Sequence, residues 1–151
     1  GRAAGGGWGL FWSPQARVKQ SVRAMAAALE DRDPDALMAH FSQNYNDPGG
    51  NTFGDMEAAV RDVFFPLIED MDVDVKSIRV HMRDGAAVAE VHGTLLYKIK
   101  GVPRREKYDE DAPAVLRFEN EDGAWRVTSV ENMGDDLSVL QESYEQMQDI
   151  F

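Results

Sequence analysis

The spacing of the apolar residues changes once along the chain, near Asp72, and this change limits the folds that are open to it. Before Asp72 the apolar side chains recur at helical spacing, and after it they alternate with polar ones as in a strand. A block of helices followed by a block of strands predicts an α+β fold, with the helices packed on an antiparallel sheet. We expect strands over about 73–83, 86–99, 108–119 and 124–132.

The predicted helices have recognisable start signals. Ser13-Pro14 and Asp33-Pro34 each place a good N-cap residue before a proline, which is favoured in the first turn of a helix. A third helix is expected after the turn-rich residues 46–55. Pro66 should kink that helix, because proline cannot donate the helical backbone hydrogen bond.

The first pair of strands has a predictable register. Asp84-Gly85 is typical of a two-residue hairpin turn. The register that follows places Ile78 on an apolar face, which should meet the helices, and His81 and His92 on an outer, polar face. A change of phase near Lys76-Ser77 predicts a β-bulge there.

Asp122-Gly123 predicts a second two-residue turn between the last two strands. Its register gives one apolar face, which continues to Glu131 at the end of the final strand. A turn of three or five residues would reverse this assignment. The other residues expected on the apolar face are Leu116, Phe118, Trp125, Val127 and Ser129.

Composition excludes several classes of function. The chain has 151 residues and a net charge of −11, from 27 Asp and Glu against 16 Lys and Arg. Nucleic acid is therefore an improbable partner, because its affinity comes largely from cationic side chains. No stretch approaches the ~20 apolar residues of a membrane-spanning helix. Cysteine is absent and the three histidines lack metal-ligand spacing, so we expect no metal and no cofactor.

Both ends of the chain are predicted to be extensions of the main domain. Residues 1–13 combine Gly and Ala with large aromatic side chains. Such a segment is typical of the spacer behind a removed export signal or lipid anchor, which favours an exported protein over a cytoplasmic one; a tag remnant is the alternative. Residues 133–151 are acidic and predict an amphipathic C-terminal helix.

The order of the elements, the segment Tyr45-Asn46-Asp47 and the strand around Trp125 together resemble the nuclear-transport-factor-2-like (NTF2-like) superfamily. Ketosteroid isomerases and SnoaL-type cyclases belong to this superfamily. The resemblance covers residues 14–132, which we expect to form one domain. It implies a cone, in which the N-terminal helices pack inside a strongly bent antiparallel sheet and a pocket opens at one end. It also implies a homodimer formed through the outer face of the sheet.

An apolar cone supports acid–base chemistry when a carboxylate base and a hydroxyl donor face its interior. The candidate bases are Asp47 and Glu131, and the candidate donors are Tyr45 and Tyr97. Each also has a structural interpretation, which we favour, such as a turn-forming role for Asp47 and a core position for Tyr97. Gly93 would either leave room for a ligand or ease the bend of the sheet. The expected pocket lining is Val91, Gly93, Leu95, Phe118, Trp125, Val127 and Ser129.

Two functions remain open. The few polar residues expected inside the cone favour a non-catalytic module that binds a small apolar ligand or takes part in assembly. The alternative is a SnoaL-like or ketosteroid-isomerase-like enzyme that acts on a hydrophobic carbonyl compound. Residues 100–111, which include four basic residues, are expected to form a solvated loop, with contact to an anionic ligand or partner as the alternative.

Overall fold

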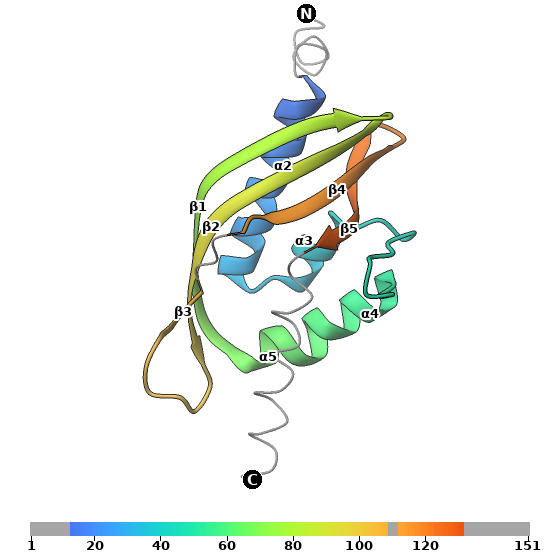
Figure 1. The fold of residues 1–151 in the computed structure, drawn as a ribbon. Helices are drawn as coiled ribbons and strands as arrows, with labels where there is room; N and C mark the ends of the chain where they lie inside the picture. The colour runs from blue at the N-terminus through green and yellow to red at the C-terminus, as the bar shows by residue number, and fades with distance from the viewer. Residues whose placement is uncertain (1–12, 109–111, 132–151) are drawn as a thin grey trace, which may run out of the picture.

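The computed structural model of the chain describes residues 13–108 and 112–131. Helices come first and a bent antiparallel sheet follows (Figure 1), so the predicted α+β class is confirmed. The helical elements are α2 (Pro14–Asp31), α3 (Pro34–Met38), α4 (Phe53–Ala58), the π-helical segment η1 (Ala59–Phe64) and α5 (Phe65–Leu67). The strands are β1 (Ile68–Arg83), β2 (Ala86–Ile99), β3 (Glu106–Tyr108), β4 (Ala114–Glu121) and β5 (Ala124–Glu131).

The helix starts follow the predicted capping signals. The Ser13 hydroxyl accepts a hydrogen bond from the Ala16 backbone N–H at 3.1 Å, and the Asp33 carboxylate accepts one from Ala36 N–H at 3.1 Å. Pro66 disturbs the third helix as expected. The disturbance takes the form of a π-helical turn just before it, because the proline ring has no room against a carbonyl held in regular α-helical geometry.

The sheet order is β1-β2-β4-β5, and β3 pairs with β2 beyond the end of β4. The predicted single strand over 108–119 is therefore wrong: two short strands, β3 and β4, occupy this region. Pro113 immediately precedes β4 and cannot donate a ladder hydrogen bond, which explains why the pairing does not extend further back. No helix in the described part of the chain is long and apolar enough to cross a membrane.

The register of the first hairpin is confirmed. Arg79 lies opposite Glu90, Ser77 lies opposite His92, and the ladder shifts between Val75 and Ser77, where the bulge was predicted. The outer face therefore carries His92 and the exposed His81, whose Nε2 lies 2.8 Å from the Glu90 carboxylate.

The bulge brings the two long strands unusually close together at Gly93. A Cβ atom at this position would lie 2.5 Å from the backbone carbonyl oxygen of Asp74 in β1, and 3.4 Å from the Val75 Cα. These are backbone atoms of a paired strand, so they cannot rotate away as a side chain can. Of the two roles considered for Gly93, the close approach favours easing the bend of the sheet, which is visible in both long strands (Figure 1).

The second hairpin has the predicted two-residue turn, with Glu121 opposite Ala124 and Phe118 opposite Val127. Phe118 and Val127 are both fully buried, so the apolar face near the turn is assigned correctly.

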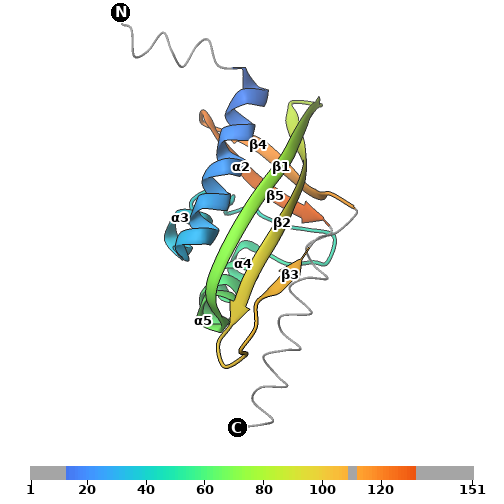
Figure 2. The same cartoon turned by 90° about the vertical axis from the view of Figure 1, so that its left-hand side faces the viewer.

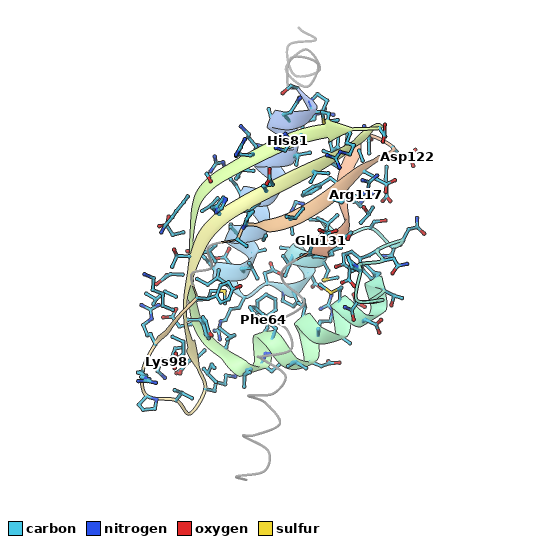
Figure 3. All side chains as sticks on the ribbon, in the orientation of Figure 1. Phe64, His81, Lys98, Arg117, Asp122 and Glu131 are labelled. Carbon is cyan, nitrogen blue, oxygen red and sulfur yellow. The ribbon has the colours of Figure 1, made fainter. Side chains whose placement is uncertain are left out.

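Further along β5 the predicted face is wrong for Ser129 and Glu131. A register shift at Thr128 makes Arg117 the partner of Ser129 and Val115 the partner of Glu131. One extra residue reverses which side chains face inward, because side chains alternate along a strand. Ser129 and Glu131 consequently lie on the outer side of the sheet, and Glu131 is exposed at the end of β5 (Figure 3).

The segment between α3 and α4 covers the outer edge of β5. Phe41 forms a parallel bridge with Val127, and the backbone N–H of Ser42 donates to the Val127 carbonyl at 2.9 Å. Asn46 N–H donates to the Thr128 carbonyl at 2.9 Å, so the contact continues across the bulge. An edge strand covered in this way does not present a free row of hydrogen-bonding groups to another chain.

Two hydrophobic clusters hold the helices to the sheet. The larger one includes Val18 and Met25 of α2 and Phe118 of β4, and the smaller one lies where α5 enters β1. Leu29 and Phe64 pack against both clusters. The helix α2 runs beside β1 (Figure 2), and its end is fixed there because the Val73 backbone N–H donates to the Glu30 carboxylate at 3.1 Å.

The N-terminal extension over residues 1–13 and the C-terminal helix over 133–151 were predicted from sequence. Apart from Ser13, which caps α2, both lie outside the described residues.

We predict that Gly93→Ala lowers the free energy of unfolding by about 1–3 kcal/mol, because the added methyl group overlaps the β1 backbone. Gly54→Ala is the matched control. It adds the same atom inside α4, where the nearest neighbour is the Thr52 Oγ1 at 3.8 Å. Helix propensity should make that variant neutral or slightly more stable. Urea unfolding of both variants measures the difference, and equal stabilities would contradict the role given to Gly93.

Candidate functional site

Tyr45 and Asp47 are the two candidate acid–base residues that the structure brings into contact. Both lie in the segment that covers β5. The Tyr45 side chain is buried, with 2% of its surface exposed, and its hydroxyl donates to Asp47 Oδ2 at 2.7 Å. The same hydroxyl oxygen accepts a hydrogen bond from the Val130 backbone N–H at 3.2 Å. Burial raises the pKa of Tyr45 above its ordinary value, and the hydrogen bond to the Asp47 carboxylate raises it further.

The Asp47 carboxylate organises the turn that follows it. Its Oδ1 accepts from the backbone N–H groups of Gly49 and Asn51, each at 3.0 Å, and from the Asn51 amide at 3.1 Å. Burial raises the pKa of Asp47, but the hydrogen bonds from Tyr45, Asn51 and Gly49 together outweigh it, so the net pKa is lowered. A general base near neutral pH needs the opposite shift. The contacts therefore favour the turn-forming interpretation of Asp47.

Tyr97 is placed far from this pair. Tyr45 bonds to Val130 of β5, and the ladder leads from there through Leu116 to Ala89 of β2. Tyr97 lies eight residues further along β2, a path of about 26 Å at about 3.3 Å per residue. Glu131 is on the outer side of the sheet. The four candidate acid–base residues are thus not gathered at one place.

The inner side of the bend carries an apolar area that the helices cover only partly. It consists of Phe64 and the inner-face strand residues Val73, Val75, Leu95 and Tyr97, all of them half-buried. We call this set the concave apolar surface. The Phe64 side chain extends from the helix toward the sheet (Figure 3) and packs against both hydrophobic clusters.

The predicted pocket lining divides between this surface and the core. Leu95 belongs to the concave apolar surface, and Val91 and Gly93 precede it on the same face of β2. Phe118, Trp125 and Val127 are buried members of the larger cluster. Ser129 faces the other way because of the bulge at Thr128.

Sequence analysis missed two residues beside this surface, Glu106 and Tyr108 of β3. Glu106 lies opposite Tyr97, and Tyr108 lies opposite Leu95, so both share the inner face with them. The alternation in Glu106-Lys107-Tyr108 is the only local signal for this strand. It is short, and the basic residues around it suggested a loop.

Elsewhere in the described residues, the buried Ser42 and Thr128 hydroxyls have structural partners, whereas the buried Thr94 Oγ1 has no hydrogen-bond partner. Ser42, which is fully buried, donates from its hydroxyl to a Glu121 carboxylate oxygen at 2.6 Å and accepts from the Asn44 backbone N–H at 3.0 Å. Burial lowers the pKa of His40, and the nearby Arg126 cation lowers it further. Within residues 13–108 and 112–131, no group of three or more His, Asp or Glu side chains is arranged to hold a metal ion.

A long helix packed inside a bent antiparallel sheet defines a cone-shaped α+β fold. Solved structures share this fold with the chain. An NTF2-like superfamily protein from Salmonella enterica serovar Typhimurium LT2 is similar with a TM-score of 0.66 and 12% identity, over 77% of this chain and 87% of that one. The fold is therefore that of the NTF2-like superfamily, and the resemblance seen in the sequence is confirmed at the level of the fold.

Other solved structures give the same result. A hexachlorocyclohexane dehydrochlorinase (LinA type 2) has a TM-score of 0.66 and 11% identity, over 77% of this chain and 81% of that one. A conserved protein from Planctomyces limnophilus has a TM-score of 0.63 and 11% identity, over 76% and 90%. No protein-family model matches the chain, and no curated protein matches it. Similarity at these identities concerns the fold alone.

We predict that Asp47→Ala lowers the free energy of unfolding at pH 7 by about 1–3 kcal/mol, because it leaves the Tyr45 hydroxyl and the turn N–H groups without their acceptor. The folded-state pKa of Asp47 is lowered, so its carboxylate contributes stability above the ordinary value of 3.8. That contribution is lost as the pH falls below 3.8, and the difference between the two proteins should shrink there.

Urea unfolding at several pH values measures this difference. Glu131→Gln is the control, because Glu131 is an exposed carboxyl group at a strand end, and it should change stability by less than about 0.5 kcal/mol. An Asp47→Ala variant as stable as the wild type at pH 7 would contradict the turn-forming role.

Proposed function

We propose that this chain is a non-catalytic module that binds a small apolar ligand on its concave apolar surface. The observation that carries the proposal is the half-buried state of Phe64, Val75 and Leu95 on the inner side of the bend. Apolar side chains that remain partly exposed inside a fold gain free energy when a ligand removes them from water, by about 25 cal/mol per Å² of apolar area. A concave site with mostly apolar walls is the usual form of a small-molecule site.

The chemistry of the candidate acids supports the absence of catalysis. Asp47 is held ionised by its hydrogen bonds and is occupied in a turn, while Glu131 is exposed on the other side of the sheet. Neither is near Tyr97, the one of the two candidate phenols that belongs to the concave apolar surface. A proton-transfer site requires its groups within hydrogen-bond reach of one substrate atom.

Acid–base catalysis on a hydrophobic carbonyl compound is the second candidate. It is favoured by a fold neighbour that is named as a dehydrochlorinase. The NTF2-like fold carries many functions, however, so a neighbour at 11% identity does not transfer its activity. The lowered pKa of Asp47 weighs against this candidate.

We further propose a homodimer formed through the outer face of the sheet. That face carries half-buried apolar side chains, among them Val88, Leu96 and Val115, between charged ones. Apolar groups mixed with charged groups on the outer face of a sheet are suited to pairing with a second copy of the same face.

Ligand binding is tested with the neutral fluorescent probe N-phenyl-1-naphthylamine. We predict binding to the wild-type protein and at least ~10-fold weaker binding to Leu95→Gln, because an amide placed on the concave apolar surface loses its water when the probe binds. Leu96→Gln is the matched control. It makes the same change one residue further along β2, where the side chain faces the other way, and it should bind the probe like the wild type.

A probe that fails to bind the wild-type protein would contradict the proposed function. Equal loss of binding in Leu95→Gln and Leu96→Gln would contradict the location of the site. Far-ultraviolet circular dichroism of both variants verifies that the sheet is intact.

The dimer is tested by sedimentation velocity. We predict a dimer for the wild type and a monomer for Leu96→Lys, since the substitution replaces an apolar side chain of the outer face with a long, charged one in each copy. Met82→Lys is the control, because Met82 is 40% exposed at the hairpin tip on the inner side, and it should leave the dimer intact. A monomeric wild type would contradict the proposal.

A further inference from the structure

The pairing of β2 with β3 places one carboxylate and two phenol side chains, those of Glu106, Tyr97 and Tyr108, on one patch of the inner face. Glu106 lies directly opposite Tyr97, and Tyr108 lies directly opposite Leu95. Directly opposite residues of an antiparallel pair have Cβ atoms about 5 Å apart, and diagonal neighbours are about 7–8 Å apart, within reach of aromatic side chains. Tyr97 and Tyr108 are such a diagonal pair, and Glu106 is next to both of them.

This patch adjoins the concave apolar surface. Tyr97 belongs to that surface and packs against the smaller hydrophobic cluster together with Phe64. Tyr108 is next to Leu95, also a member of the surface. The rim of the apolar site therefore contains one carboxylate and two phenol rings.

The basic residues of the same region are directed elsewhere. Lys107 lies opposite Leu96 and so shares the outer face with it. Arg105 donates to the carboxylates of Asp70 and Asp72 at 2.9 and 2.7 Å, and Lys98 forms an ion pair with Glu69. These contacts do not favour the anionic ligand that was considered for the 100–111 loop.

Arg104 is the cation near the patch. Its Nε lies 3.5 Å from Glu106 Oε1, and its side chain is 83% exposed. An ion pair this exposed contributes little free energy, because water screens it and the long side chain loses entropy. The guanidinium group therefore occupies a position from which a better-placed cation can displace it.

The geometry points to an apolar molecule with a cationic amino group as the ligand of this site. This inference rests on the proposed function, and it adds the chemical class of the ligand. The apolar part lies on the concave apolar surface, and the ammonium group lies against the Glu106 carboxylate between the rings of Tyr97 and Tyr108. A carboxylate attracts the cation directly, and aromatic rings attract it through the negative charge of their faces. The net charge of −11 also concentrates cations around the protein.

The test compares three ligands that share one apolar body: 2-naphthylmethylamine, 2-naphthylmethanol and 2-naphthoate. Each is titrated against the complex of the protein with N-phenyl-1-naphthylamine, and its displacement of the probe is measured. We predict that the amine binds roughly 10-fold more tightly than the alcohol, and that the carboxylate binds most weakly.

Three variants locate the cation site. Glu106→Gln should remove most of the preference for the amine and leave the affinity for the alcohol unchanged. Tyr108→Leu should reduce the same preference by a smaller factor. Arg104→Gln should increase the affinity for the amine a few-fold, because it removes the competing cation. Glu119→Gln is the matched control: it removes the same charge from the outer face of β4 and should behave like the wild type.

The possible results distinguish a failure of the cationic-ligand inference from a failure of the proposed function. A probe that does not bind the wild-type protein would overturn both. A probe that binds, together with equal affinities for the amine and the alcohol, would overturn the inference and leave the apolar site in place. Equal effects of Glu106→Gln and Glu119→Gln would also overturn it, since the preference would then come from the net charge of the protein.

Discussion

The close approach of β1 and β2 at Gly93 shapes the whole sheet. A bulge in β1 pushes the Asp74 carbonyl oxygen to where a side chain at Gly93 would begin, and only a residue without Cβ fits. The local twist and bend that a bulge introduces turn two long strands into a curved wall. Without that curvature, α2 and the α4–α5 helix would lie on a flat sheet, and no concave side would exist.

Curvature also determines which apolar residues become core and which remain partly exposed. Near the hairpin turns, small residues such as Ala87 and Ala89 let α2 pack tightly, and the larger cluster fills that end of the cone. Beyond the bulge the end of α2 stays bonded to β1 through Glu30 and the Val73 backbone N–H, and Phe64 packs against both clusters. On this part of the inner face Val73, Val75, Leu95 and Tyr97 remain half-buried.

The polar residues fall into two groups with different physical roles. Asp47 and Tyr45 satisfy backbone groups in the segment that covers β5, and the lowered pKa of Asp47 follows from the donors around it. Glu106 and Tyr108 lie on the inner face of the sheet, opposite Tyr97 and Leu95. The first group stabilises the segment that covers β5, and the second places a carboxylate and a phenol beside the concave apolar surface.

Four local features were predictable from the amino-acid sequence: the capped helices, the two tight turns, the position of the β1 bulge and the outward orientation of His81. Each follows from a residue and its immediate neighbours. The position of Glu131 and the proximity of Glu106 to Tyr97, in contrast, depend on how the strands pair in the folded chain. One inserted residue at Thr128 reverses a strand face, and a three-residue strand such as β3 exists only because β2 extends past β4 to pair with it. Both effects depend on the partner strand, about which the local sequence carries no information.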